Sequence, residues 1–108
     1  MKTDIKIPLG TKIGRGLFLP HFSGIVINGK SVIGKNCTIY QNITIGSKKG
    51  ENGDAPMIGD NVVIATGAII IGKIKLGINV MIGANSVILK DVGDNSVVAG
   101  NTARVIIF

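Results

Sequence analysis

With 108 residues, the chain is long enough for one domain with a single core. The sequence has no apolar run of about 18 residues and no apolar signal core near its start, so we expect no membrane span and a cytoplasmic location. The single Cys37 excludes an internal disulfide framework. The net charge of +6 fits solvated faces, or a partner that is nucleic acid, an acidic glycan or a phosphorylated cofactor. Nucleic acid is the weakest of these, because one tyrosine, three phenylalanines and no tryptophan leave few rings for base stacking.

The first half of the chain shows a six-residue period. Hexads that begin with Ile or Leu occur both before and after a first break. Their leading residues are Ile7, Ile13 and Leu19, and then Ile27, Ile33, Ile39 and Ile45. Leu19 and Ile27 stand eight residues apart instead of six, which places a two-residue insertion in the segment from His21 to Ile27.

The period is most regular in residues 58–92, after a second break of thirteen residues between Ile45 and Ile58. The leading residues there are Ile58, Ile64, Ile70, Leu76, Ile82 and Ile88. The fifth place is small or apolar, as in Val62 and Ala68, and Cys37 takes this place in an earlier hexad. The fourth place is often Asn or Gly. Neither a helix of 3.6 residues per turn nor a two-residue strand alternation produces a strict period of six.

This short repeat predicts an all-β solenoid. Each hexad is a short strand plus a turn, three hexads close one triangular coil, and about four to five coils stack as parallel strands. The leading Ile or Leu points inward, and Asn or Gly in the fourth place suits a turn with positive φ. We expect residues 1–108 to form a single domain, with a protruding loop at 46–57 and a C-terminal cap or tail at 93–108 that leaves the repeat.

The hexads, with an aliphatic first residue, a frequent Gly after it and a small fifth residue, resemble the hexapeptide-repeat left-handed parallel β-helix over nearly the whole chain. The resemblance implies the left-handed winding, which the usual right-handed crossover rule does not suggest. It also implies a homotrimer, whose packing would bury one flat apolar face of each copy.

The only histidine, His21, lies at the first break of the repeat, and interruptions of solenoids often carry functional residues. The run GRGLFLPHFSGIVIN, the loop IGSKKGENGDAPMIGDN and the late AGNTAR resemble the serine acetyltransferase branch of the hexapeptide acyltransferases. That branch carries an Asp-His-Ala-Thr-Gly run whose histidine is the general base, so the resemblance implies this role for His21. Pro20 replaces the acid, and Asp54 or Glu51 from the loop, or a backbone carbonyl, would have to orient the imidazole.

The reaction implied by the resemblance is acetyl transfer from acetyl-CoA to a hydroxyl. The branch grips its amino-acid acceptor with an Arg-His-Pro run, whereas the aligned residues here are Asp54, Ala55 and Pro56. Because Asp54 would repel a carboxylate at close range, a sugar hydroxyl is our first hypothesis for the acceptor and serine is the second. We expect Ser23, Lys48 and Asp54 to contact the acceptor.

The resemblance also implies a groove for the pantetheine arm of acetyl-CoA. Small residues on exposed turns would let the arm approach, and the candidates are Ala65, Gly67, Gly83 and Ala84. Lys90 and Arg104 are the candidates for holding the phosphates. We expect no metal, and a single histidine argues against a γ-type carbonic anhydrase, which needs several histidine ligands.

A non-catalytic β-helix scaffold or binding module is the third hypothesis. Serine acetyltransferases carry a helical N-terminal domain that pairs their trimers. This chain begins almost at its first coil, so we expect that domain to be absent and a simple trimer to form instead of a hexamer.

Overall fold

The computed structural model describes residues 5–49 and 53–107, which form short strands and turns without a helix. Sheet A contains β1 (Ile5–Lys6), β3 (Ile25–Ile27), β6 (Thr44–Gly46), β9 (Ile69–Ile71) and β12 (Val87–Ile88). Sheet B contains β2 (Lys12–Ile13), β4 (Val32–Ile33), β7 (Met57–Ile58) and β10 (Lys75–Leu76). Sheet C contains β5 (Thr38–Ile39), β8 (Val63–Ile64), β11 (Met81–Ile82), β13 (Val97–Gly100) and β14 (Ala103–Ile107).

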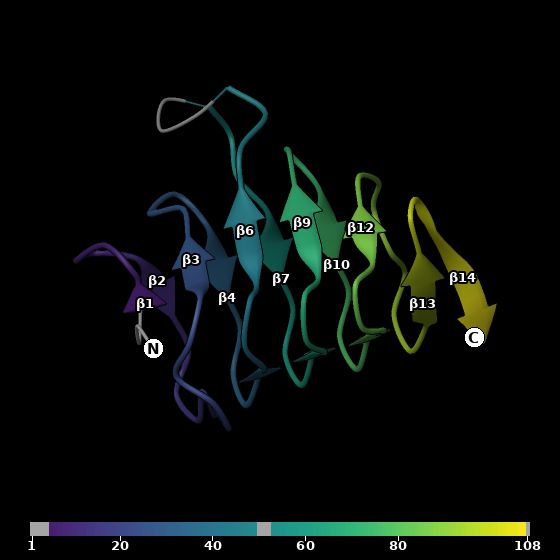
Figure 1. The fold of residues 1–108 in the computed structure, drawn as a ribbon, viewed down its shortest axis with the longest axis horizontal. Helices are drawn as coiled ribbons and strands as arrows, with labels where there is room; N and C mark the ends of the chain where they lie inside the picture. Colours follow the sequence, from purple (N-terminus) through teal and green to yellow (C-terminus); the bar gives the residue numbers. More distant parts are fainter. Residues whose placement is uncertain (1–4, 50–52, 108) are drawn as a thin grey trace.

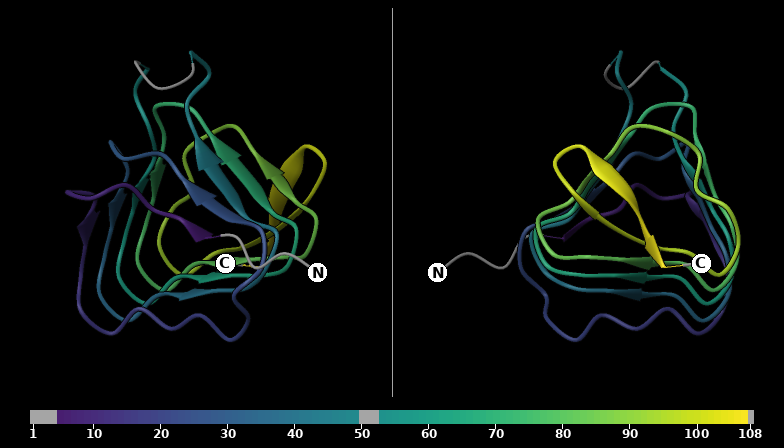
Figure 2. Two further views of the ribbon diagram at one scale, coloured as in Figure 1. Left: turned by 60° about the vertical axis from the view of Figure 1, so that its left-hand side comes forward. Right: turned by 90° about the vertical axis from the view of Figure 1, so that its right-hand side faces the viewer.

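The three sheets form the faces of a triangular prism, because from β3 to β12 the strands pass from sheet A to B to C in turn (Figures 1 and 2). The prism therefore has three edges, each a stack of turns. The A–B edge consists of residues 7–11, 28–31, 47–49 with 53–56, 72–74 and 89–91. The B–C edge consists of residues 14–17, 34–37, 59–62, 77–80 and 93–96, and the C–A edge of residues 19–24, 40–43, 65–68 and 83–86.

The leading residues of the hexads fill the interior in register. Ile39 pairs with Ile64, and Ile64 pairs with Ile82, so that three fully buried side chains stack along one column. The other buried leading residues are Ile27, Ile33, Ile45, Ile58, Ile70, Leu76 and Ile88. Each such side chain stabilises the fold by roughly 1.5–3 kcal/mol relative to an exposed one. The predicted inward orientation is confirmed.

The turns at the edges have the predicted residue types, with a small or apolar residue in the fifth place of the hexad and often an Asn with positive φ in the fourth. Fifth-place residues such as Cys37, Val62 and Ala68 are completely buried at the corners. The preceding Asn residues adopt positive φ between 57° and 62°, a region in which Asn and Gly are better tolerated than other residues. They are Asn36, Asn42, Asn61, Asn79, Asn85 and Asn95.

The two breaks in the repeat become insertions at different edges. The insertion around His21 lies at the C–A edge, and the longer one lies at the A–B edge between β6 and β7, where the loop protrudes (Figure 1). The returning part of this loop is packed, since Gly53, Ala55 and Pro56 are buried and the Val32 amide donates to the Pro56 carbonyl over 3.1 Å.

The C-terminal segment differs from the expectation that the repeat ends at residue 92. β13 pairs in parallel with β11, and Val98 lies beside Ile82 after a step of only sixteen residues. The shortening occurs at the A–B edge. Val92 pairs with Leu76 and follows the core residue Ile88 by four positions, whereas successive leading residues are normally six positions apart. Among the described strands, only β14 leaves the winding, as an antiparallel partner of β13.

The described part of the chain contains no helix that is long and apolar enough to cross a membrane. The cytoplasmic location stays a prediction.

Candidate active site

His21 lies in the turn 19–24, where the C–A edge begins, and its side chain is exposed. The turn is fixed against the next coil, because the Asn42 amide donates to the Ser23 carbonyl over 2.9 Å. Within the part of the chain that the structure describes, no carboxylate forms a hydrogen bond with the His21 imidazole. The imidazole is therefore accessible, and none of the described acids orients it within one copy.

The small residues proposed for the donor lie on the same edge as His21. Ala65 and Gly67 belong to the turn 65–68, and Gly83 and Ala84 belong to the turn 83–86. Gly67 has a φ of +79°, and a Cβ at this position would collide with Oδ1 of Asn85 on the next coil. The structure thus brings His21 and Ser23 onto one edge with the four small residues predicted for the pantetheine arm, but not with the two predicted phosphate-binding cations.

Two further polar residues of the C–A edge, Gln41 and Thr66, were not predicted from the sequence. Thr66 donates its hydroxyl hydrogen to Oε1 of Gln41 over 3.2 Å, and both side chains are half-buried. His21, Gln41, Thr66 and Ala84 all occupy the third place of hexads that turn at the C–A edge. Because three hexads make one coil, every third hexad turns at the same edge. Counting hexads in this way, with the two insertions left out, would have predicted from the sequence that these four residues stack on one another.

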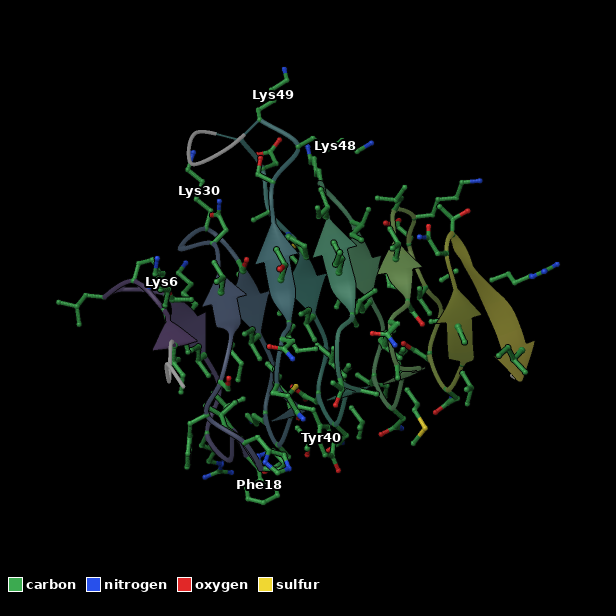
Figure 3. The ribbon with its side chains drawn as sticks, in the orientation of Figure 1. Lys6, Phe18, Lys30, Tyr40, Lys48 and Lys49 are labelled. Carbon is green, nitrogen blue, oxygen red and sulfur yellow. The ribbon has the colours of Figure 1, made fainter. Side chains whose placement is uncertain are left out.

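The remaining acceptor candidates lie elsewhere in the same copy. Lys48 and Asp54 belong to the A–B edge, where the strands of sheet A end, whereas the His21 turn lies where these strands begin. Figure 3 shows this separation, with Lys48 and Lys49 at one end of the molecule and Phe18 and Tyr40 at the other. Asp54 therefore cannot orient His21 within one copy, and Glu51 lies outside the described residues.

The two cations proposed for the phosphates are neighbours at the C-terminal end. Lys90 from the A–B edge and Arg104 from β14 both line a hollow of about 260 Å³. Lys90 lies at the opposite end of sheet A from His21, so this pair is not part of the C–A edge.

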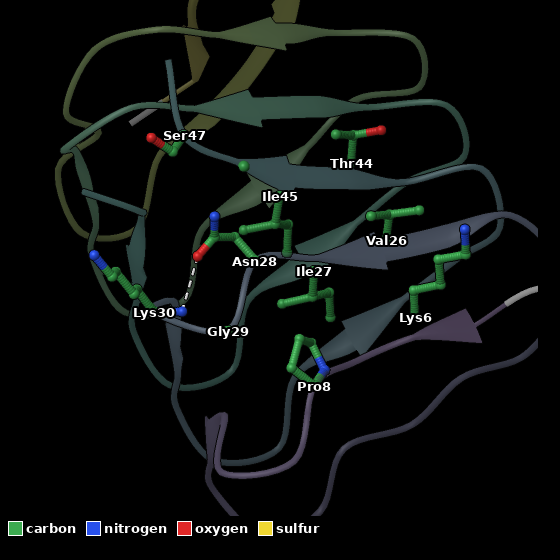
Figure 4. Close-up of a pocket in the computed structure, with 11 residues that line it drawn as sticks. Lys6, Pro8, Val26, Ile27, Asn28, Gly29, Lys30, Thr44, Ile45 and Ser47 are labelled. Carbon is green, nitrogen blue, oxygen red and sulfur yellow. Dashed lines mark hydrogen bonds between the residues drawn. The ribbon is translucent and has the colours of Figure 1, made fainter. Parts of the chain in front are cut away.

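A further hollow of about 660 Å³ lies over β1, β3 and β6 of sheet A and the A–B turns that follow these strands (Figure 4). Its floor includes Val26 and Ile45, and Lys6 and Lys30 stand at its sides. Its lining contains none of the residues that the sequence proposed for catalysis, acceptor binding or donor binding.

Cys37 is not available for chemistry. It is completely buried at the B–C edge, and its thiol donates to the Gly59 carbonyl over 3.2 Å. Burial raises the pKa of the Cys37 thiol above its ordinary value. The fifth place that Cys37 takes in its hexad is thus a core position. Over the described ranges, no group of three His, Cys, Asp or Glu residues could hold a metal ion.

Comparison with known proteins adds to this geometry. No family model matches the chain. It is 48% identical over 105 residues to a serine acetyltransferase of Staphylococcus aureus (strain Mu50 / ATCC 700699), a match that covers 96% of this chain and 49% of that protein. A serine acetyltransferase of Staphylococcus epidermidis is 47% identical with the same coverage. The chain thus spans about half the length of these curated relatives.

Solved structures give the same result. Soybean serine acetyltransferase complexed with serine superimposes with a TM-score of 0.90 and 39% identity, covering 94% of this chain and 42% of that one. A serine acetyltransferase in complex with CoA gives a TM-score of 0.88 and 36% identity, covering 94% and 42%. The fold is therefore the left-handed parallel β-helix. Over the length that these comparisons span, the chain is similar to hexapeptide-repeat acyltransferases.

Proposed function

We propose that the chain transfers the acetyl group of acetyl-CoA to the hydroxyl of L-serine, with His21 as general base. The observation that carries the proposal is the C–A edge, where an accessible His21 shares one line with Ala65, Gly67, Gly83 and Ala84. The 48% identity to serine acetyltransferases supports the same reaction.

His21 can accept a proton in the first step of the reaction and return it in the second. The pKa of an alcohol lies far above 7, so a neutral imidazole takes the hydroxyl proton as the oxygen forms its bond to the acyl carbon. The carbon–sulfur bond then breaks, and the imidazolium returns the proton to the leaving thiolate. Backbone amides on the C–A turns are candidates for holding the oxyanion that forms between these steps.

The comparisons favour serine over a sugar as the acceptor. The relatives described above are serine acetyltransferases, and one of them was solved with serine bound. A sugar hydroxyl remains the second candidate, because Asp54 and Ala55 stand where the resemblance expects an arginine and a histidine.

We further propose a homotrimer in which the site lies between copies. Lys48 and Asp54 lie across sheet A from His21, so they can take part in acceptor binding only at the His21 of another copy. In the same assembly, Lys90 and Arg104 would hold the donor phosphates.

An acceptor panel tests the choice of substrate. Release of the CoA thiol from acetyl-CoA would be followed with L-serine, D-serine, glucosamine and galactose at equal concentrations. We expect turnover with L-serine to exceed that with each sugar. A higher kcat/KM with a sugar than with L-serine would show that the acceptor is a sugar. If no acceptor increases thiol release, a non-catalytic scaffold would be favoured.

A further inference from the structure

Gln41 lies next to His21 on the following coil of the C–A edge. Phe18 pairs in parallel with Thr38, and His21 and Gln41 each follow this bridge by three positions. Both residues take the third place of a hexad, which points outward from the prism. The side chain of Gln41 is therefore the first one that a ligand meets on the way along this edge from His21.

A hydrogen bond to the next coil determines which end of the Gln41 amide is free. The Thr66 hydroxyl donates to Oε1 of Gln41 over 3.2 Å, and both side chains are half-buried. Since Oε1 and Nε2 point in different directions from the amide carbon, Nε2 faces away from the Thr66 hydroxyl. Nε2 carries two hydrogens, and neither donates to another residue in the described ranges. Gln41 thus presents a hydrogen-bond donor, and not an acceptor, at this edge.

Many backbone amides of the edge are already occupied. In each turn after that of His21, the amides in the second and fourth places of the hexad donate to backbone carbonyls over 2.8–3.1 Å. They are the amides of Tyr40, Asn42, Ala65, Gly67, Gly83 and Asn85. An oxyanion at this edge would therefore need donors other than these amides.

Gln41 also lies between the proposed base and the turns proposed for the acetyl donor. The third-place residues follow one another along the prism in the order His21, Gln41, Thr66 and Ala84. A pantetheine arm that lies over the turns 65–68 and 83–86 and ends at His21 therefore carries its thioester past Gln41.

The spacing of the coils suits a donor at this position. The imidazole must lie within about 3.2 Å of the hydroxyl oxygen whose proton it takes. That oxygen attacks the acyl carbon, so the carbonyl oxygen lies farther from the imidazole than the hydroxyl oxygen does. Neighbouring coils are about 4.8 Å apart, which places a side chain of the next coil within reach of the carbonyl oxygen.

We propose that Nε2 of Gln41 donates a hydrogen bond to the carbonyl oxygen of the acetyl group, and that Thr66 positions it. This assignment rests on the acetyl transfer proposed above. When the serine oxygen bonds to the acyl carbon, the carbonyl electron pair moves onto the carbonyl oxygen, and the hydrogen bond from Nε2 strengthens. The pair returns when the carbon–sulfur bond breaks, and His21 protonates the departing thiolate. Gln41 is thus a catalytic residue, and Thr66 is a positioning residue.

Five variants test the two roles by steady-state kinetics with acetyl-CoA and L-serine. Gln41→Met removes the donor at nearly constant size, and Gln41→Glu keeps an acceptor for Thr66 but offers the oxyanion no hydrogen. Thr66→Val removes the hydroxyl, and Thr66→Ser retains it. Lys35→Met is the matched control, because Lys35 takes the third place of a hexad on the same coil at the B–C edge.

We expect Gln41→Met to lower kcat about 10²- to 10³-fold, the usual cost of losing one oxyanion donor, with both KM values within about twofold. Gln41→Glu should lose at least as much. Thr66→Val should lower kcat about tenfold, because Gln41 remains but is no longer held, and Thr66→Ser should restore it to within about twofold. Lys35→Met should change kcat less than about twofold.

The possible failures can be told apart. Serine-dependent turnover that Gln41→Met and Gln41→Glu leave unchanged would overturn the role of Gln41 and leave the proposed function intact. A higher KM with an unchanged kcat would overturn it as well, since Gln41 would then only bind a substrate. No serine-dependent turnover by the unaltered chain would overturn the proposed function, and this assignment with it. Thermal unfolding of each variant would show that a loss of kcat is not a loss of folded protein.

Discussion

The amide of Asn42 donates to the carbonyl oxygen of Ser23 over 2.9 Å, which ties the turn that carries His21 to the following coil. Asn42 belongs to the turn 40–43, and the amide of Gly67 in the next turn donates to the carbonyl of Gln41 in the same turn 40–43 over 3.1 Å. The backbone of the C–A edge is therefore a continuous hydrogen-bonded ladder. His21 has a fixed backbone position while its side chain remains exposed.

Replacing Gly67 should damage this ladder. Gly67→Ala puts a Cβ at a φ of +79° and against Oδ1 of Asn85, so we expect it to lower the free energy of unfolding by about 2 kcal/mol or more. Gly93→Ala is the matched control, because a Cβ at Gly93 would meet nothing within 4 Å. Urea unfolding of both variants measures the difference. Equal stabilities would show that the Gly67 turn is not held as described.

The core column predicts a larger effect. Ile64 is completely buried between Ile39 and Ile82, so Ile64→Ala should lower the free energy of unfolding by roughly 2–5 kcal/mol. Its neighbour Val63 points to the other face of the strand and is only half-buried, so Val63→Ala should cost less than about 1 kcal/mol. Denaturant unfolding of the pair tests the inward orientation, which similar losses would contradict.

Cys37 should make stability depend on alkaline pH. Burial raises the pKa of its thiol in the folded state, so folding favours the protonated form. This contribution is fully present below the ordinary thiol pKa of about 8.5 and is lost as the pH rises toward the raised folded value, by up to about 1.4 kcal/mol per pH unit. Urea unfolding between pH 7.5 and pH 10 should show a steeper loss for the unaltered chain than for Cys37→Ala. Parallel curves would mean that the thiol is not buried in the folded protein.

Asp54 offers a test of how the acceptor is held. If serine binds near the loop of another copy, its carboxylate meets the negative charge of Asp54, and Asp54→Asn should lower the KM for serine about fivefold. The KM for a neutral sugar should not change. A fall in kcat without a change in KM would instead show that Asp54 supports His21 from a neighbouring copy. Unchanged kinetics with both acceptors would remove Asp54 from the site.

The period of six was sufficient to predict the interior of this fold. It placed Ile64 and Ile82 inside and Asn61 at a turn with positive φ, because each repeat must satisfy the same steric requirements as the one below it. The period did not predict β13, since the shortened turn before Val92 changes the step between coils without changing the kind of residue that is buried.

The candidate site was predictable only in part. His21 stood out at a break in the repeat, and the small residues on its edge followed from the resemblance. Lys48 and Asp54 were assigned to the acceptor from the resemblance, and the period alone did not predict that their loop turns at a different edge from His21. Which edge of one copy meets which edge of another depends on the outward faces, and the repeat does not constrain these.

The most direct test of the proposed function is serine-dependent release of the CoA thiol from acetyl-CoA by the unaltered chain and by His21→Ala. The imidazole is exposed, so the variant should unfold at the same temperature as the unaltered chain. We predict turnover that requires L-serine and falls about 10²- to 10⁴-fold in the variant, the usual contribution of a general base. Serine-dependent turnover that His21→Ala leaves unchanged, or no such turnover in either chain, would contradict the assignment.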